Sequence, residues 1–142
     1  MRRCCASGSW KVVLMRLADQ LCPCSSGARY AECCMPIHEG KDAETAEELM
    51  RSRYSAFALQ LESHLMRSWH PRTRPEPPLI APGTTWRRLE VLDTVDGGTD
   101  DEDGIVEFRA HGMQDGEAFV MQERSRFVRR ACRWVYLDGE MN

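Results

Sequence analysis

The cysteine-rich stretch at residues 22–34 constrains this chain more than any other feature, because it holds four thiols within thirteen residues. A C-x-C pair is followed, eight residues later, by a vicinal C-C pair, which gives Cys22, Cys24, Cys33 and Cys34. Four thiols so close together suit one tetrahedral ion, and Zn²⁺ is the commonest choice for an all-sulfur site. A closed shell of four sulfurs leaves no open position for water, so we predict one Zn²⁺ per chain that is structural or interaction-forming, not catalytic. The alternative is two strained local disulfides.

The residues between the two cysteine pairs fit a compact metal-binding loop. Residues 25–27 are Ser-Ser-Gly, which is turn chemistry, and Gly27 can supply a positive φ where the chain reverses. We expect Arg29 to offset part of the net charge of about −2 that four thiolates and one Zn²⁺ carry. Tyr30 is expected to cover one side of the site.

His38 and the cysteines outside the cluster have weaker patterns. His38 follows the last cysteine closely and is a potential substitute ligand, but four cysteines already complete a tetrahedral shell, so we expect His38 to be solvated. Cys4 and Cys5 form a second vicinal pair without a C-x-C pair nearby, and we expect two exposed reduced thiols there. Cys132 stands alone at a predicted turn and is assigned no role.

The run C-P-C-x-S-G-x-x-Y-x-x-C-C resembles the SEC-C motif, a zinc knuckle found at the tail of the preprotein translocase motor and in many unrelated proteins. Sequence further along resembles the YchJ family of uncharacterised proteins, in which a SEC-C knuckle precedes a domain with the nuclear transport factor two-like fold. The matching segments are residues 49–57, 69–71, 73–75, 123–127 and 133–139. The resemblance spans roughly residues 20–139 and implies a fold and a metal rather than a reaction. Ser25 and Ala28 replace a Gly and a Lys of the usual motif, so a partner that contacts that lysine would not find it here.

Length and charge limit the classes of protein to consider. At 142 residues the chain suits one compact domain plus an appendage. We predict an N-terminal extension at residues 1–18, poorly ordered in one interpretation, the knuckle at residues 19–38 and the nuclear transport factor two-like domain at residues 39–142. The formal charge of −3 argues against a general nucleic-acid binder. No apolar run approaches the length of a membrane span, and clustered cysteines with no convincing signal peptide favour the cytoplasm.

Periodicity predicts an α+β fold. Thr45 and Glu48 have capping-box spacing at the start of a helix, and a second helical segment runs over residues 62–69 until Pro71 ends it. Residues 71–83 hold five of the seven prolines and form an extended loop. Four strands are predicted at residues 84–95, 105–111, 118–128 and 133–137, with a hairpin at 114–116. Helices are expected on one face of a curved antiparallel sheet, giving a cone-shaped domain beside the small zinc knuckle.

A cavity between the helices and the sheet is the second candidate site, because folds of this type commonly enclose one. Residues expected to reach it are Tyr54, Trp69, His70, Trp86, Glu107, His111, Glu123, Arg124 and Trp134. His70 is suited to acid–base chemistry near neutral pH, and Glu107 or Glu123 would orient it. The alternative is that His70 caps the helix end before Pro71 and packs against Trp69.

Arginines form a third feature: Arg51, Arg53, Arg74, Arg124 and Arg126. Arg51 and Arg53 are two apart on a helix and point in different directions, whereas Arg124 and Arg126 are two apart on a strand and share a face. They suit an anionic ligand held by forked hydrogen bonds. The alternative is internal pairing with Glu48, Glu107 or Glu123.

These patterns favour a non-enzymatic zinc-binding protein. Its knuckle would contact a partner protein, and its cone would bind a small ligand or form a homodimer. A second hypothesis is a small-molecule enzyme of isomerase or hydrolase type that uses His70 as acid or base. A third is a thiol-redox or metal-handling protein that uses Cys4, Cys5 and Cys132.

Overall fold

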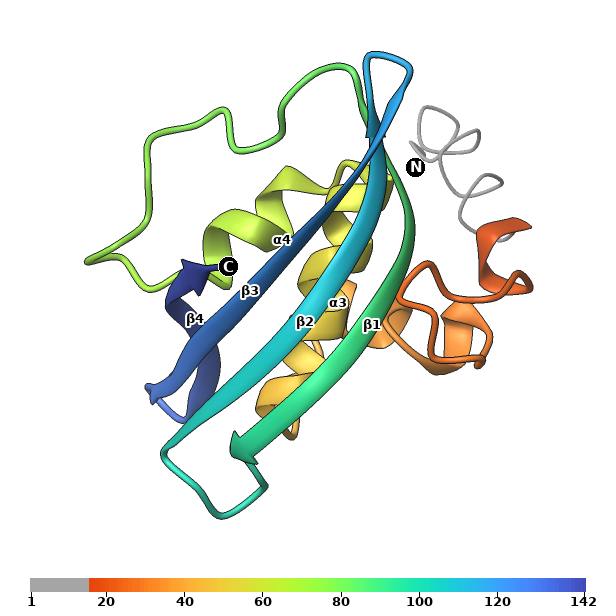
Figure 1. Ribbon diagram of the computed structural model, residues 1–142. Helices are drawn as coiled ribbons and strands as arrows, with labels where there is room; N and C mark the ends of the chain where they lie inside the picture. Colours follow the sequence, from red (N-terminus) through yellow and green to blue (C-terminus); the bar gives the residue numbers. More distant parts are fainter. Residues whose placement is uncertain (1–15) are drawn as a thin grey trace, which may run out of the picture.

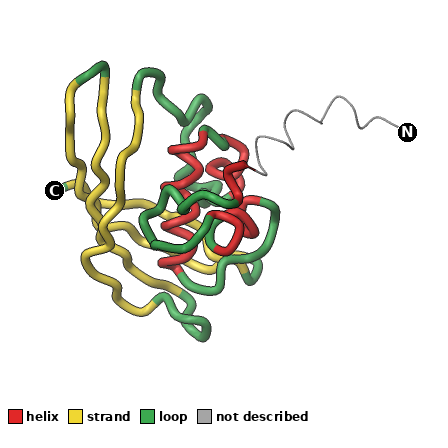
Figure 2. Tube along the Cα trace, turned by 90° about the vertical axis from the view of Figure 1, so that its right-hand side faces the viewer, coloured by secondary structure: helices red, strands yellow, loops and turns green. Residues whose placement is uncertain are grey.

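The computed structural model describes residues 16–142, and within them four strands form one antiparallel sheet in the order β1-β2-β3-β4. The strands are β1 (Thr84–Asp96), β2 (Asp103–Gln114), β3 (Glu117–Arg130) and β4 (Arg133–Met141). Helices α3 (Ala46–Leu59) and α4 (Glu62–Arg67) lie against one face of the curved sheet (Figure 1). Figure 2 shows the same arrangement from the side, with the strands in one layer and the helices gathered on one side of it. The predicted α+β fold is confirmed.

The sheet owes its curvature to its turns and its irregular pairing. Asp115 and Gly116 both have positive φ, 51° and 88°, as a two-residue hairpin turn between right-twisted strands requires. The pairing register shifts twice between β1 and β2 and once between β3 and β4, at Arg126/Phe127. Such bulges bend the strand and increase its twist, so the sheet wraps around α3.

Helix α3 starts where the capping signal predicts. The Thr45 side chain accepts a hydrogen bond from the Glu48 N–H at 3.1 Å, and the Glu48 carboxylate accepts one from the Glu44 N–H at 3.0 Å. The first turn docks on the β1–β2 connection, where the Ala46 N–H donates to the Gly97 carbonyl at 2.9 Å. A Cβ at Gly97 would lie 2.9 Å from the Ala46 methyl group, so this close approach depends on glycine.

Helix α4 is shorter than predicted, and the reason lies in β4. The chain leaves the helix at Ser68, whose carbonyl accepts from the Tyr136 N–H at 2.8 Å. The His70 N–H then donates to the Tyr136 carbonyl at 2.8 Å, so Trp69 forms a parallel bridge with Tyr136 instead of a last helical turn. This bridge carries Trp69 onto the inner side of the sheet.

The N-terminal part adds the short 3₁₀ helix η2 (Tyr30–Glu32) and α2 (Met35–His38), which lie beside β1 and α3 (Figure 1). Of the predicted N-terminal extension, residues 1–15 lie outside the described residues, and with them the expectation for Cys4 and Cys5; residues 16–18 are helical. The predicted boundary between residues 38 and 39 stays a prediction. In the described part of the chain, no helix combines the length and apolar character that crossing a membrane requires.

Candidate metal centre and candidate ligand cavity

The four cysteines predicted to bind metal come together. Their Sγ atoms all lie within 4.8 Å of one another, with 3.5 Å between Cys24 and Cys33 and 3.9 Å between Cys33 and Cys34. Tetrahedral Zn²⁺ with Zn–S bonds of about 2.3 Å places its sulfurs about 3.8 Å apart. All four are free thiols, so the arrangement fits one tetrahedral ion and not the alternative of two local disulfides. We call these four side chains the cysteine cluster.

Local backbone geometry builds the cluster. The Cys22 N–H donates to the Ala28 carbonyl at 2.8 Å, and the chain reverses between them through Ser25 and Gly27, whose φ values are 67° and 90°. The Ser26 hydroxyl lies 3.2 Å from the Cys33 Sγ atom. The predicted turn at residues 25–27 is thus confirmed, and it brings the first cysteine pair against the second.

The cysteine cluster belongs to the protein core. Cys22, Cys24 and Cys34 are 4%, 0% and 1% exposed and pack in the same hydrophobic cluster as α3 and the sheet. Ser55 of α3 donates to the Cys34 Sγ atom at 3.4 Å and lies 3.5 Å from that of Cys22. Tyr30, 1% exposed, covers the cluster as predicted. Metal binding here would therefore fasten the N-terminal segment to α3.

Arg51, and not Arg29, supplies positive charge to the cysteine cluster. The Arg51 Nη1 atom donates to the Cys24 carbonyl at 2.9 Å and lies 3.9 Å from the Cys24 Sγ atom, while Nε donates to Glu47 at 3.0 Å. Arg29 instead lies 4.0 Å from Asp19, and both side chains are exposed. The prediction for Arg29 is wrong because its side chain points to solvent from the turn.

The thiols influence one another's ionisation. Hydrogen bonds from Cys22 and Cys34 lower the pKa of the Cys24 thiol, and the bonds with Cys22 and Cys24 raise the pKa of Cys34. Burial raises the pKa of Cys33 to about 11. A thiolate at Cys24 thus disfavours ionisation of Cys33 and Cys34, and a bound cation would relieve this repulsion.

His38 is neither solvated nor part of the cysteine cluster, so the expectation of a solvated His38 is wrong. Its Nδ1 atom accepts from the Tyr30 hydroxyl at 2.6 Å, and its Nε2–H donates to the Ser52 carbonyl at 2.7 Å. The His38 ring packs edge to face against the His64 ring, with 4.8 Å between the two ring centroids. His64 is 4% exposed, and burial, with His38 as second cause, lowers its pKa to about 3. His64 is therefore neutral at pH 7, and burial lowers the pKa of His38 as well.

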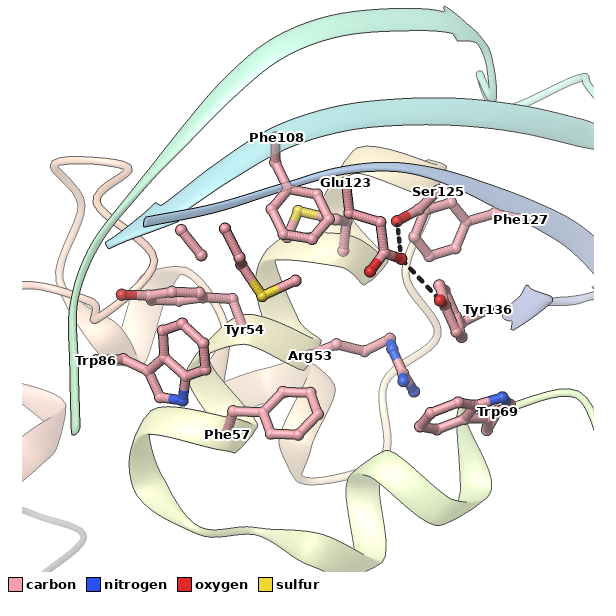
Figure 3. A pocket seen from close by; sticks show the side chains of 13 residues that line it. Arg53, Tyr54, Phe57, Trp69, Trp86, Phe108, Glu123, Ser125, Phe127 and Tyr136 are labelled. Carbon is pink, nitrogen blue, oxygen red and sulfur yellow. Dashed lines mark hydrogen bonds between the residues drawn. The ribbon is translucent and has the colours of Figure 1, made fainter. Parts of the chain in front are cut away.

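A cavity of about 240 Å³ lies between α3 and the inner face of the sheet (Figure 3). Aromatic and methionine side chains make up most of its wall, with an arginine and a glutamate at one end. The lining residues are Met50, Arg53, Tyr54, Phe57, Trp69, Trp86, Phe108, Ala110, Met121, Glu123, Ser125, Phe127 and Tyr136. This is the apolar, concave environment that small-molecule sites share.

Arg53 is the positive group of the cavity and is only 6% exposed. Its Nη1 atom donates to the Leu65 carbonyl at 3.1 Å and to the Ser68 hydroxyl at 2.7 Å. The guanidinium carbon lies 4.8 Å from the ring centre of Trp69 and 4.6 Å from that of Tyr136. Burial lowers the pKa of Arg53 to about 10, so the side chain stays charged at pH 7.

Glu123 is the negative group. Its Oε2 atom accepts hydrogen bonds from the Ser125 hydroxyl and the Tyr136 hydroxyl, both at 2.7 Å. Gly139 on β4 leaves the space for this carboxylate, because a methyl group at that position would overlap it. Burial, followed by the hydrogen bond to Glu123, raises the pKa of Tyr136, which keeps this hydroxyl a donor.

The cavity contains four of the nine residues predicted for it: Tyr54, Trp69, Trp86 and Glu123. Strand alternation places Glu107, His111 and Arg124 on the outer face of the sheet instead. There Glu107 accepts from Arg124 at 2.8 Å, and His111 lies 2.6 Å from a Glu90 oxygen.

Trp134 and His70 also lie outside the cavity. The Trp134 indole N–H donates to the Glu44 carbonyl at 3.2 Å, beneath the start of α3. The His70 Nδ1 atom accepts from the Arg72 N–H at 3.0 Å in the turn after the Trp69 bridge. His70 is therefore not among the residues that line the cavity, where the second hypothesis has it act as acid or base.

The alternative interpretation, pairing with Glu48, Glu107 or Glu123, is confirmed only for Arg124, which pairs with Glu107. Arg124 also lies 3.2 Å from Asp93, and Arg126 donates twice to Asp138 at 2.7 and 2.6 Å. Arg74 donates to the Met66 carbonyl at 3.1 Å.

Sequence reasoning did not single out Arg53 as a cavity residue. The available signal was its spacing, since Met50, Arg53, Tyr54 and Phe57 follow the i, i+3, i+4, i+7 pattern of one helix face.

Comparisons with known proteins agree with both parts of the molecule. The family model described as "YchJ, middle NTF2-like domain" matches residues 45–139, and the SEC-C motif matches residues 20–36. A UPF0225 protein of Streptomyces coelicolor is 48% identical over 120 residues, covering 84% of this chain and 94% of that protein. One of Deinococcus radiodurans is 46% identical, covering 83% and 87%.

Two solved structures are similar in fold. The solution structure of a SEC-C motif containing protein from Rhodopseudomonas palustris gives a TM-score of 0.72 at 31% identity, covering 84% of this chain and 96% of that one. The crystal structure of a SEC-C motif containing protein from Psychrobacter arcticus gives 0.71 at 28% identity, covering 90% and 86%.

Proposed function

This chain belongs to the YchJ-like family with a middle NTF2-like domain, and from that premise we propose that it binds a small, largely apolar molecule in the cavity between α3 and the sheet. The observation that carries the proposal is the cavity itself, about 240 Å³ with mostly aromatic walls. An engineered cavity of about 150 Å³ is large enough to bind benzene. The present one therefore has room for a substituted single ring or a fused pair of rings.

In this proposal the cysteine cluster holds one structural Zn²⁺. When bound, the ion would supply folding free energy and no reaction, because four thiolates fill its coordination shell. Its ligands would be Cys22, Cys24, Cys33 and Cys34, with Arg51 and Ser55 of α3 in contact with their sulfurs. Such a site needs reduced thiols, which supports placing the protein in the cytoplasm.

Contact with a partner protein through the knuckle is a second candidate function. Leu21, next to the first metal ligand, is 70% exposed, and covering this apolar side chain with a partner would remove it from water. The buried side of the knuckle is already covered by α3, so a partner would meet the side around Leu21. A pull-down with the Leu21→Asp variant tests this: loss of a partner that the wild-type protein retains supports the contact, and equal recovery contradicts it.

Toluene is a suitable probe for the ligand-binding proposal because it has no polar group. We expect toluene to raise the unfolding temperature of the zinc-loaded protein, since a ligand that binds only the folded state stabilises it. Ala110, buried in the cavity wall, offers a test variant, and Ala118, exposed on β3, offers the matched control. Ala110→Leu should abolish the toluene effect and Ala118→Leu should keep it. No effect on the wild-type protein, or equal effects on both variants, would contradict the proposal.

A further inference from the structure

The polar end of the cavity specifies the chemical class of the ligand, an inference that rests on the ligand-binding function proposed above. We infer that the ligand carries one uncharged group that both accepts and donates hydrogen bonds, such as a carboxamide or a hydroxyl, attached to an aromatic body. Figure 3 shows the groups that would select it: the Arg53 guanidinium, the Glu123 carboxylate and the Tyr136 hydroxyl lie at one end, and Tyr54, Phe57 and Trp86 at the other.

The cavity carries one positive and one negative charge that do not neutralise each other by direct contact. Among residues 16–142, Arg53 has no carboxylate oxygen within 4.0 Å, although Glu123 lines the same cavity. The two side chains are connected through Tyr136, which lies under the Arg53 guanidinium and donates to Glu123. The site as a whole is therefore close to neutral.

Both charged groups keep hydrogen-bonding capacity that the described residues do not use. Arg53 donates through Nη1, while its Nε and Nη2 atoms have no acceptor in the described chain. Glu123 accepts through Oε2, while Oε1 has no donor there. Arg53 is buried and Glu123 is half-buried, so unused hydrogen bonds on these two charged groups favour a ligand group with an acceptor toward Arg53 and a donor toward Glu123.

Charged ligand groups fit this end less well. A carboxylate would be attracted by Arg53 but repelled by Glu123. An ammonium group would be attracted by Glu123 but repelled by Arg53. Each charged group would also lose its hydration on entering the cavity. A carboxamide offers a carbonyl to the guanidinium and an N–H to the carboxylate without either penalty. The aromatic body follows from the opposite wall, where Tyr54 and Trp86 meet edge to face at 5.9 Å.

Three probes of similar size and different charge test the inference: phenylacetamide, phenylacetate and phenethylamine, titrated calorimetrically at pH 7 into the zinc-loaded protein. We expect phenylacetamide to bind at least tenfold more tightly than either charged probe and more tightly than toluene. In the Glu123→Gln variant the site carries a net positive charge, so the affinity ratio of phenylacetate to phenylacetamide should rise at least tenfold. Circular dichroism checks that the variant is folded, and the comparison in the wild-type protein stands without it.

The outcomes separate the two proposals. If toluene and all three probes fail to bind, the proposed ligand-binding function is wrong. If toluene binds but phenylacetamide is no better than phenylacetate or phenethylamine, the cavity binds ligands and the inference about their class is overturned. Equal affinities for toluene and phenylacetamide would also overturn it, because ordered water would then satisfy the polar end.

Discussion

The cysteine cluster and the cavity lie on different sides of α3, and they are built in different ways. The cluster comes from four residues close in sequence, and α3 contributes Arg51 and Ser55 to its surroundings. The cavity comes from α3, the Trp69 bridge and all four strands, and α3 contributes Arg53. The cysteine cluster is formed by residues close in sequence, and polar contacts surround its sulfur atoms. The cavity is formed by residues distant in sequence, and its apolar space can admit a ligand. Arg51 and Arg53 are therefore a matched pair for separating metal binding from ligand binding.

Loss of the metal should have the largest effect, because it removes the support of α3 on one side. We expect Cys34→Ser, or treatment with a chelator, to lower the free energy of unfolding by several kcal/mol, since structural zinc contributes about 10–16 kcal/mol of binding free energy in small zinc-finger peptides. Metal content per chain and denaturant unfolding measure this. Cys132→Ser is the control, because Cys132 is exposed at the β3–β4 turn and lies outside the cluster. Equal stability of the two variants would contradict a structural metal.

Lowering the pH should destabilise the folded protein through protonation of His64. The pKa of His64 is about 3 in the folded protein against an ordinary 6.5, so the unfolded chain binds more protons between these values. Stability is therefore lost as the pH falls from 6.5 to 3, by up to about 1.4 kcal/mol per pH unit.

The measurement is the free energy of unfolding as a function of pH. Protonation of the cysteine thiols also contributes to the slope of this curve. Replacing the imidazole with an amide in His64→Gln should flatten the slope relative to wild type. Parallel slopes for His64→Gln and wild type would show that His64 is not buried in its neutral form.

Gly139→Ala should affect the cavity without affecting the metal. The added methyl group displaces the Glu123 carboxylate from the hydroxyls of Ser125 and Tyr136, at a cost of about 1–3 kcal/mol for the lost hydrogen bonds. We also expect the preference for phenylacetamide to disappear while zinc content stays at one per chain. Gly98→Ala is the control, since a Cβ there meets only an Asp101 oxygen at 3.4 Å. Unchanged probe affinity in Gly139→Ala would place Glu123 outside the binding site.

Arg51→Gln should produce the smallest of these effects. Polar partners of metal ligands typically change metal affinity by about 10–100-fold, and Arg51 lies against Cys24. Competition with a zinc chelator should show weaker binding in Arg51→Gln, by about tenfold, and no change in Arg29→Gln. Phenylacetamide affinity should be the same in both. A larger effect of Arg29→Gln would restore the prediction made from sequence.

The contrast between the two sites also explains what the sequence could predict. Cys22 and Cys34 are twelve positions apart, so turn chemistry at Ser25 and Gly27 was enough to bring them together. The helix start at Thr45 and the turn at Gly116 were equally local signals. Glu123 faces the cavity and Arg124 faces solvent because of strand register, and His70 misses the cavity because Trp69 leaves α4 to pair with β4. These outcomes depend on contacts between distant segments, which periodicity alone does not determine.

Methionine methyl groups offer the most direct test of the two-sided arrangement, because they report on both sides of α3. Met50 and Met121 line the cavity, whereas Met35 lies in α2 beside the cysteine cluster. Zinc-loaded protein labelled at the methionine methyl carbons would be titrated with phenylacetamide and followed by NMR. We expect the Met50 and Met121 signals to shift together and the Met35 signal to stay in place. A shift of Met35 alone, or no shift of Met50 and Met121 at saturating probe, would contradict a ligand site between α3 and the sheet.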